Sequence, residues 1–585
     1  MFTRSLLMAI TLCALTLGSA AQGLRVTSDT ARADLLEDVQ RELAPGIVPS
    51  TQFEARRQAR QAARKAKDYL NTKGYFSPEI AYAVDPGPPV QANVKIEPGP
   101  RYVFNEISVQ TGNVALSETA RRAIDTVRGL QSGDVALPQA ILSEEAGLLA
   151  ALRQAGYAEA QASERRLLGD RDAGTLDLTY RLMPGPRIRF GQVVFSENSR
   201  TRRSALARLV PFQAGDLYTP QALAVLNQRL NGTRMYRFVT VQLADQATGM
   251  NREGDEVRDV IVSLEDQNRY TLTGGTSFST SEGPGLTAGL TRRNASRRGD
   301  TLSAGMTLAT LERAFTVDWR IPNVTAFDRT LVLSSEIGRE ETDAFDREAI
   351  TVSGAFDVRH SKHLSYTLGA ASEFTREEDA FEQRDQQILS TSLGGRLDYA
   401  DDPLDATRGW RVDTRVEPGV VIGDRAAQYV SLNGQISAYQ SLDESSRFVA
   451  ATRVRSGFVF GAALSDLPVS RRFFAGGGGS ARGFEYQSVG PREADGTPTG
   501  GRGLLEVSSE LRWRRDKPLG FVVFLDGASV SADQGVEVSD MRYSAGLGVR
   551  YDTLVGPIRF DLATPIDPDD GDDPVQVYVS IGQAF

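Results

Sequence analysis

The feature that most constrains the fold is an alternation of apolar and polar residues that recurs through the second half of the chain. In residues 315–321 Phe, Val, Trp and Ile alternate with Thr, Asp and Arg, and the same period returns at 410–417, 505–514 and 558–562. A period of two places successive side chains on opposite faces of a strand. A soluble sandwich also alternates, but here charges of both signs fill the polar face in strand after strand. The pattern therefore favours a membrane β-barrel whose apolar face meets lipid.

The predicted barrel occupies residues 268–585. At about 20 residues for each strand and its share of loop, this length provides about sixteen antiparallel strands. In the last strand Val579, Ile581 and Phe585 share one face, and the sequence given stops on that aromatic residue. A final strand of this kind resembles the signal by which outer-membrane barrels are recognised for insertion.

The first residues predict export from the cytoplasm. Residues 1–21 combine a positive start at Arg4, an apolar core from Leu6 to Leu17, and small residues that predict cleavage after Ala21. The one cysteine, Cys13, lies inside this segment, so the mature chain is expected to be cysteine-free. No later run of about 18 apolar residues predicts a membrane helix.

Composition and missing motifs exclude several functions. The chain has 66 Lys and Arg against 75 Asp and Glu, a net charge of −9, whereas nucleic-acid binders usually carry a basic surplus. His360 and His363 would point to opposite faces of a strand, and no phosphate-binding Gly-Lys-Ser/Thr loop is present. The segment 478–482 lacks the last glycine of a hydrolase nucleophile elbow. We therefore expect no enzyme activity, no metal, no cofactor and no nucleic-acid partner.

The first half of the chain contains an internal repeat. The Pro-Gly-Pro-Arg segment at 98–101 returns at 184–187, and a helix end closed by glycine and tyrosine occurs at 69–75 and again at 151–157. A weaker third copy runs through 226–236. Each copy predicts a strand, two helices and two strands, which gives three α+β modules at residues 22–100, 101–185 and 186–267.

One helix of the first module is strongly basic. Its cationic residues are Arg56, Arg57, Arg60, Arg64, Lys65 and Lys67. Such a run is usually a solvated helix face. The alternative is a docking surface for an acidic partner or for inner-membrane lipid.

The segment 474–484, Phe-Ala-Gly-Gly-Gly-Gly-Ser-Ala-Arg-Gly-Phe, is the most informative in the chain. It resembles the Arg-Gly-Phe/Tyr loop of the BamA/TamA-type superfamily of outer-membrane insertases, which joins POTRA modules to a C-terminal barrel. The resemblance implies that the loop motif Arg482, Gly483 and Phe484 folds into the lumen. It also implies an acidic partner for the arginine on the barrel wall.

The first candidate partner is Asp526, because Phe524-Leu525-Asp526 matches the family's Phe-x-Asp-x-Gly pattern, although Ala528 stands where the pattern has glycine. Glu510 and Glu506, on the preceding inward row, are further candidates. Four consecutive glycines allow the sharp turn that the inward loop needs. The alternative is a flexible surface loop with an incidental arginine.

Three modules before a sixteen-stranded barrel resemble the TamA-type subfamily, the barrel component of the translocation and assembly module. That resemblance implies an assembly factor in the Gram-negative outer membrane, in contact with outer-membrane lipid and with its modules in the periplasm. It also implies a large inner-membrane-anchored partner of the TamB type, and unfolded outer-membrane proteins such as autotransporters as clients. The alternative is a two-partner-secretion pore, which would carry two modules and a plug helix before Arg25.

The resemblance also implies a weak seam between the first and last strands. On the first strand we expect Tyr270, Leu272 and Gly274 at this seam. On the last strand we expect Val579, Ile581, Gly582 and Phe585. An open strand edge templates another strand, which is how a client could be accepted.

Overall fold

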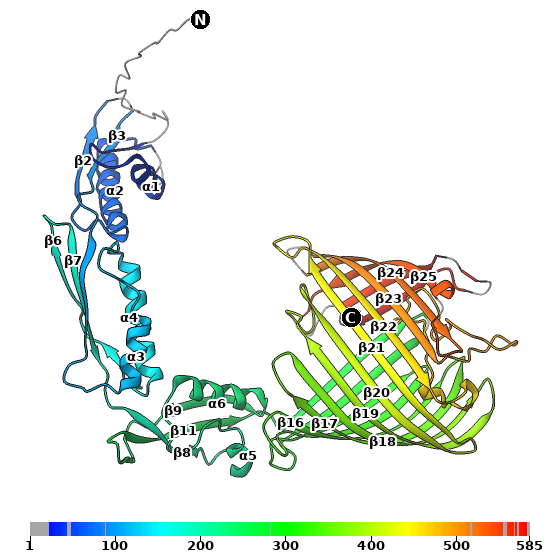
Figure 1. Cartoon of the computed structure of the whole chain (residues 1–585). Coiled ribbons are helices and arrows are strands. Elements are labelled where there is room, and N and C mark those ends of the chain that lie inside the picture. Colours follow the sequence, from blue (N-terminus) through cyan, green and yellow to red (C-terminus); the bar gives the residue numbers. More distant parts are fainter. Residues whose placement is uncertain are drawn as a thin grey trace, which may run out of the picture. The chain divides into compact units, whose positions relative to one another are not determined.

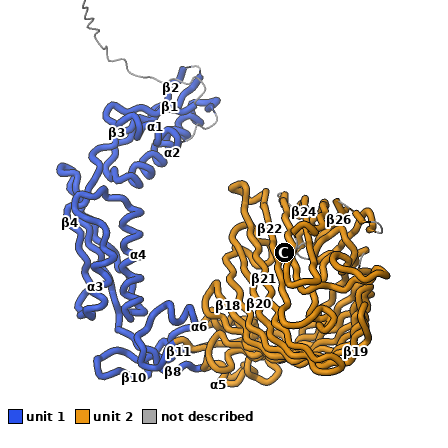
Figure 2. Tube along the Cα trace, turned by 45° about the vertical axis from the view of Figure 1, so that its right-hand side comes forward, with its two compact units in different colours: residues 1–194, 212–225, 241–261 blue, residues 195–211, 226–240, 262–585 orange. Residues whose placement is uncertain are grey.

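The computed structural model describes residues 23–43, 48–87, 89–280, 282–514, 518–536, 538–553, 558–566, 568–569 and 572–581. The expected signal segment and its cleavage site at Ala21 lie outside these residues. The chain divides into two compact units (Figure 2). One comprises residues 1–194, 212–225 and 241–261, and the other residues 195–211, 226–240 and 262–585.

The N-terminal sheet contains β1 (Leu24–Thr27), β2 (Glu79–Asp85) and β3 (Gln91–Glu97) in the order β1-β3-β2, with β1 parallel to β3. The helices α1 (Ala33–Leu43) and α2 (Gln52–Thr72) lie between β1 and β2 in the chain (Figure 1). Small residues at 55, 59, 62 and 66 of α2 are buried in one core with Ala92, Val94 and Ile96 of β3. The repeated alanines place the basic residues of the same helix on its other sides.

The second sheet repeats this plan with a separate core. It contains β4 (Val103–Gln110), β5 (Gln161–Ala162), β6 (Arg166–Asp170) and β7 (Thr175–Met183), with β7 in the centre and β4 parallel to it. The helices are α3 (Glu118–Val127) and α4 (Pro138–Gln154). None of the helices among the described residues is both long enough and apolar enough to span a membrane.

A third sheet follows in the same element order. Its elements are β8 (Ile188–Phe195), α5 (Arg203–Ala207), α6 (Pro220–Gly232), β9 (Tyr236–Leu243), β10 (Gly249–Met250) and β11 (Glu256–Asp266). The strand order is β10-β11-β8, and β9 also pairs with β11. The three sheets fall within residues 22–100, 101–185 and 186–267, which we keep as proposed module boundaries.

Residues from β12 onward form a closed antiparallel barrel of sixteen strands, as the alternating pattern predicted (Figure 1). The strands are β12 (Tyr270–Ser279), β13 (Gly283–Arg293), β14 (Thr301–Ala309), β15 (Glu312–Ile321), β16 (Arg329–Glu341), β17 (Phe345–Arg359), β18 (Leu364–Asp379), β19 (Gln383–Asp398), β20 (Gly409–Gly423), β21 (Ala427–Ser441), β22 (Phe448–Phe460), β23 (Gly503–Arg514), β24 (Leu519–Ser531), β25 (Arg542–Tyr551), β26 (Ile558–Pro565) and β27 (Gln576–Ile581).

The two rims of the barrel differ in character. We call the rim where β12 begins the proximal rim and the opposite one the distal rim. Near the proximal rim, the ring of Trp513 stacks with those of Phe448 and Phe521, and Trp410 stacks with Tyr399. Rings of this kind form the aromatic girdle at the interface of membrane barrels. At the distal rim most turns are short, and one long segment, residues 461–502, joins β22 to β23.

Within the unit that contains the barrel, the segments around α5 and α6 contact turns of the proximal rim. The Arg208 guanidinium donates to the Asn323 carbonyl over 3.0 Å. The Asn294 side chain donates to the Thr201 hydroxyl over 2.9 Å, and the Arg229 guanidinium lies 3.9 Å from the centre of the Phe327 ring. This part of the third sheet is therefore packed against the barrel turns.

Candidate functional site

Residues 461–502 fold into the barrel and bury much of their own surface. Leu467, Phe473, Ala475 and Val489 of this segment pack with apolar residues on the inner face of the barrel wall. Ala481 and Phe484 belong to the same cluster, and both are 1 % exposed. The segment, which we call the lumen loop, is thus a packed element and not a flexible surface loop.

Glycine is required where the loop approaches the wall. Gly476, Gly477 and Gly483 have φ of +111°, +92° and +99°, which other residues adopt only with strain. A Cβ at position 483 would lie 2.8 Å from Cβ of Ser544 and 3.2 Å from the carbonyl carbon of Thr564. The backbone therefore reaches the wall only because these side chains are absent.

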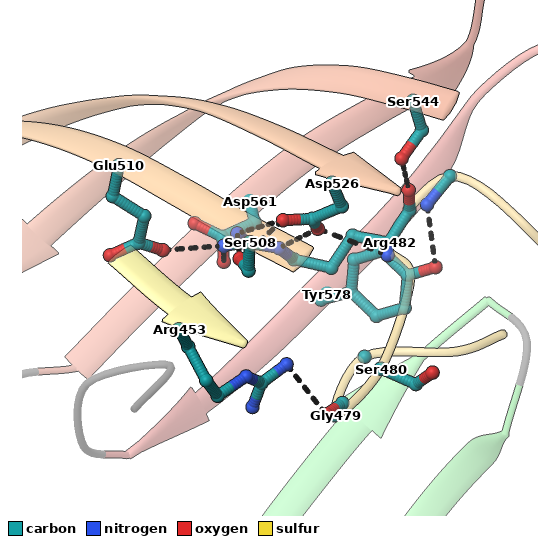
Figure 3. A network of polar contacts seen from close by, with 12 residues as sticks. Arg453, Gly479, Ser480, Arg482, Ser508, Glu510, Asp526, Ser544, Asp561 and Tyr578 are labelled. Atoms are coloured by element: carbon teal, nitrogen blue, oxygen red, sulfur yellow. Dashed lines mark hydrogen bonds and ion pairs between the residues drawn. The ribbon is translucent and has the colours of Figure 1, made fainter. Parts of the chain in front are cut away.

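The loop places the Arg482 guanidinium among the carboxylates of the wall (Figure 3). Nε donates to one Asp526 oxygen over 2.7 Å and Nη2 to the other over 3.0 Å, a bidentate pair. The backbone N–H of Arg482 donates to the same carboxylate over 3.2 Å. The guanidinium also lies 3.5 Å from the centre of the Phe524 ring. Arg482 and Asp526 are each 1 % exposed.

Two further carboxylates complete this site. Nη1 of Arg482 donates to Glu510 over 2.8 Å and lies 3.4 Å from an oxygen of Asp561. Arg512 pairs with Glu510 over 2.8 Å, and Arg550 pairs with Asp561. Arg559 also lies 3.7 Å from an oxygen of Asp561. We call these seven residues the tip cluster: four guanidinium groups, of Arg482, Arg512, Arg550 and Arg559, and three carboxylates, of Glu510, Asp526 and Asp561. Each buried carboxylate has at least one guanidinium partner, which offsets the cost of burying its charge.

The third candidate partner, Glu506, lies in the same inward row but does not bind Arg482. Its carboxylate accepts a hydrogen bond from the Ser480 hydroxyl and pairs with Arg455 over 3.3 Å. Ser480 in turn accepts a hydrogen bond from the Gly476 N–H over 3.1 Å. Glu506 therefore holds the glycine turn of the loop, which precedes Arg482 in the chain.

A second charged cluster holds the start of the lumen loop on other strands. Arg472 pairs with Asp379 of β18 over 2.6 Å, and Arg471 pairs with Glu417 of β20 over 3.0 Å. The Val469 N–H donates to Glu377 over 3.2 Å. We call this the stem cluster; its cations are Arg347, Arg384, Arg471 and Arg472 and its anions Glu373, Glu377, Asp379 and Glu417. The loop is thus fixed at two separate parts of the wall.

The lumen loop also contacts the last strand and the turn that follows the first strand. The Tyr578 hydroxyl, on the lumen side of β27, accepts a hydrogen bond from the Gly483 N–H over 3.2 Å and donates one to the Phe484 carbonyl over 3.3 Å. Glu282, at the turn after β12, accepts a hydrogen bond from the Gly478 N–H over 3.1 Å. The loop therefore links the last strand to the turn between β12 and β13.

The seam itself has few pairs among the described residues. Phe278 pairs with Val579 and Ser279 with Tyr578, which is two register pairs, whereas β12 shares ten with β13. The Thr280 N–H donates to the Val577 carbonyl over 3.0 Å.

The residues expected at the seam are placed differently from one another. Val579 pairs across the seam, while the described pairs of Tyr270, Leu272 and Gly274 are with β13. Ile581 pairs with Ile558 of β26. Gly582 and Phe585 lie outside the described residues. The pairs recorded across the seam are therefore at its distal end.

Sequence reasoning missed Asp561, Tyr578 and the whole stem cluster. The adjacent Arg471 and Arg472, just before two phenylalanines, were a usable signal, because two cations in an apolar loop need partners.

The two histidines lie at the turn between β17 and β18, where the His363 ring stacks on Tyr399 at 4.2 Å.

Residues 294–585 match the Omp85 superfamily domain. The outer membrane protein assembly factor BamA of Nitratidesulfovibrio vulgaris is 26% identical over 429 residues, which cover 70% of this chain and 53% of that protein. BamA of Neorickettsia risticii is 23% identical over 560 residues, covering 88% of this chain and 71% of the relative. This chain thus spans about half the length of the first of these relatives.

A solved structure shares the fold. The crystal structure of BamA from Haemophilus ducreyi lacking POTRA domains 1–3 superposes with a TM-score of 0.69 at 18% identity. The superposition covers 82% of this chain and all of that one. The architecture of α/β modules followed by a sixteen-stranded barrel is therefore that of the BamA structure.

Proposed function

Given that the barrel of this chain belongs to the Omp85 superfamily, we propose that the protein is an outer-membrane assembly factor that inserts or translocates other outer-membrane proteins. The two similar BamA proteins are named outer membrane protein assembly factors, which supports an assembly function for this chain. In this proposal the modules stand in the periplasm and the barrel is embedded in outer-membrane lipid.

The observation that carries the proposal is the link between the lumen loop and the seam. Gly478 and Gly483 hydrogen-bond to Glu282 and Tyr578, one on each side of a junction with two described register pairs. A strand edge left open in lipid loses several kcal/mol for each unpaired backbone group. Such an edge therefore pairs readily with an incoming strand, and no nucleotide is needed to drive this step.

Within the superfamily we propose a TamA-like role, together with a large inner-membrane-anchored partner of the TamB type. Three successive units support this assignment, each with one strand, two helices and then two strands in the first unit or three in the others. Crosslinking in intact envelopes, followed by purification of the full-length protein, tests it. Recovery of a large inner-membrane-anchored protein crosslinked to residues 23–267 is the expected result, and recovery of outer-membrane lipoproteins alone would argue for a different role.

The activity is tested by reconstitution of the full-length protein into liposomes with an unfolded client barrel. We expect faster client insertion than into empty liposomes, measured as the protease-protected fraction over time. No acceleration for any client would contradict the proposal. If a soluble polypeptide is instead carried across the bilayer without client insertion, the chain is a secretion pore of the two-partner type.

A further inference from the structure

The solvent side of α2 carries cations that the fold does not use. Taking about 100° per residue, Arg56, Arg57, Arg60, Arg64 and Lys67 fall within about 100° of arc on the helix. All five are exposed, and no ion pair to any of them is recorded among the described residues. We call these five residues the basic face. They lie away from Ala55, Ala59, Ala62 and Ala66, which pack on the sheet.

The basic face works against the helix that carries it. Arg56, Arg60 and Arg64 follow one another at intervals of four residues, and like charges at this spacing destabilise a helix. Within the helix the only acidic residues are Glu54, which accepts a hydrogen bond from the Ser50 hydroxyl and is also attracted by Arg57, and Asp68, one turn after Arg64. Two carboxylates cannot offset five cations, so the basic face keeps an excess of positive charge that lowers the stability of the helix.

The chain contains two internal controls for this reading. The second helices of the other two sheets, α4 and α6, occupy the same place in the element order as α2. Each carries a single basic residue, Arg153 in α4 and Arg229 in α6. Since three copies of one plan fold and only one is basic, the basic face serves a purpose outside the fold.

An apolar side chain stands within this face. Phe53 lies at about the middle of the arc, close to the start of the helix, and is 76 % exposed. Cations with a projecting aromatic ring are typical of helices that adsorb to anionic membrane surfaces. A lipid surface leaves the guanidinium groups hydrated, whereas a protein partner would bury them at a large desolvation penalty unless each found a carboxylate.

We propose that the basic face of α2 binds the phosphate-rich surface of an anionic phospholipid bilayer. This inference goes beyond the assembly function and does not depend on it, because the binding needs neither client nor seam. Each cation near such a surface contributes about 1 kcal/mol of attraction, so the loss of three weakens binding about 100-fold. The attraction must also fall as salt is raised, since the Debye length at physiological ionic strength is about 8 Å.

The test uses the full-length protein in zwitterionic nanodiscs, mixed with vesicles of phosphatidylcholine with or without phosphatidylglycerol. Co-flotation is expected only with the anionic vesicles, and it should weaken about 100-fold in the triple variant Arg56→Gln, Arg60→Gln, Arg64→Gln. Glutamine keeps the helix propensity, so the variant should retain the parent's far-ultraviolet circular dichroism. Phe53→Ala should weaken binding several-fold in a way that salt does not alter.

The matched control removes three exposed arginines from the second sheet and its helix: Arg121→Gln, Arg166→Gln, Arg181→Gln. It has the same net charge as the triple variant and should bind like the parent. A second arm puts phosphatidylglycerol in the nanodisc itself; if this abolishes capture of anionic vesicles, the face binds the protein's own membrane, and otherwise it binds an opposing one. Equal loss in both triple variants, or no binding of anionic vesicles while an acidic protein crosslinks to the helix in envelopes, overturns the proposal.

Discussion

At position 482 a guanidinium meets acceptors that no other side chain reaches together. Its nitrogens contact the carboxylates of Asp526, Glu510 and Asp561, and Nη2 also donates to the Ser508 hydroxyl over 3.3 Å. Lysine has three donors on a point charge and cannot form the bidentate pair with Asp526. The residue is therefore fixed by both charge and shape.

The two members of the pair are not equivalent, and this yields the first prediction. Arg482→Ala leaves the Asp526 carboxylate buried without its recorded ion-pair partner, which should lower the free energy of unfolding by about 3 kcal/mol. Asp526→Ala leaves Arg482 in contact with Glu510 and Asp561, so we expect a loss of about 1–2 kcal/mol. Urea unfolding of the barrel in detergent, followed by its electrophoretic mobility without heating, measures both.

Double-mutant cycles separate the candidate partners. Arg482 and Asp526 should show a coupling energy of at least ~1 kcal/mol, whereas Arg482 and Glu506 should be nearly additive. The free energy of unfolding of the Arg482→Lys variant should lie between those of the parent and of Arg482→Ala. A larger loss for Asp526→Ala than for Arg482→Ala would show that the pairing of the buried Asp526 carboxylate is not what holds the loop.

At this scale the sequence identified the arginine and ranked Asp526 first, on the strength of a motif. It could not separate Glu506 from Glu510, because the two lie on one face of one strand, about 13 Å apart along it, and the pattern does not say at which height of the wall the loop places the arginine. It also gave no sign of Asp561, since that contact depends on how far β26 lies from β23 around the barrel. Contacts between the loop and distant strands depend on how the barrel closes, and the sequence pattern within a single strand carries no information about them.

At the scale of elements, the lumen loop is held at its tip and at its stem by separate clusters. The tip cluster uses β23 to β26, and the stem cluster uses strands β17 to β20. Between them the loop buries Phe473 and Ala475. Two attachments with an apolar segment between them define the path of the loop.

This arrangement predicts that the stem can be released while the tip stays in place. Arg472→Ala removes the pair with Asp379 and the hydrogen bonds to the Leu467 and Thr499 carbonyls. Local opening of the stem should then become about tenfold more frequent, given a loss of ~1.4 kcal/mol. Limited proteolysis of the folded barrel, with the cut sites mapped by mass spectrometry, should show new cleavage within residues 461–472.

The matched control is Arg492→Ala in the same loop, whose side-chain hydrogen bonds within the described part of the chain are to two backbone carbonyls, those of Gly496 and Ser488. It should leave the stem as resistant as in the parent. If Arg472→Ala exposes residues around Arg482 to the protease as readily as the stem, the two clusters open together and the loop is one cooperative unit.

The sequence predicted the secondary-structure elements well wherever it contains a regular pattern of residues. The two-residue alternation predicted the barrel, and the Pro-Gly-Pro repeat located the strand, helix, helix, strand, strand order of the first sheet. The second and third sheets each add a short strand, β5 and β10, that the repeat did not predict. The lumen loop has neither the alternation nor the repeat. Its glycines therefore indicated a turn, but not how the loop packs against the barrel wall. Its 3-10 turns at Leu464–Asp466 and Val469–Arg471 are fixed by contacts with the wall, which are remote in sequence.

At the scale of the whole molecule, the sheets differ in how much they depend on the barrel. The first two have their own apolar cores, centred on Leu70 with Val94 and on Leu148 with Tyr180. The third contributes α5 and the first five residues of β9, 236–240, to the unit that contains the barrel. Residues 22–185 should therefore be soluble, monomeric and α+β by circular dichroism when produced alone.

Extension to residue 267 should add a less stable part. The fragment 22–267 lacks the barrel, so Arg208 and Arg229 lose their contacts with the barrel turns. Hydrogen exchange should show residues 195–240 exchanging faster in the 22–267 fragment than in the full-length protein. Equal protection in both would mean that the third module folds independently of the barrel. An unfolded 22–185 fragment would contradict the separate cores.

The last prediction concerns the seam as the moving part of the assembly. Phe278 and Val579 form a register pair across it, and the mature chain is expected to contain no other cysteine, so Phe278→Cys with Val579→Cys should form one disulfide. Oxidation should stop client insertion in liposomes, and reduction should restore it, because the β12–β27 edge must open to pair with a client strand. The control, Leu272→Cys with Leu290→Cys, locks β12 to β13 on the same lipid-facing wall and should leave insertion unchanged. If the oxidised seam variant inserts clients at the parent rate, the client enters without opening this junction, and the contacts of Tyr578 and Glu282 with the lumen loop then serve only to fix the loop.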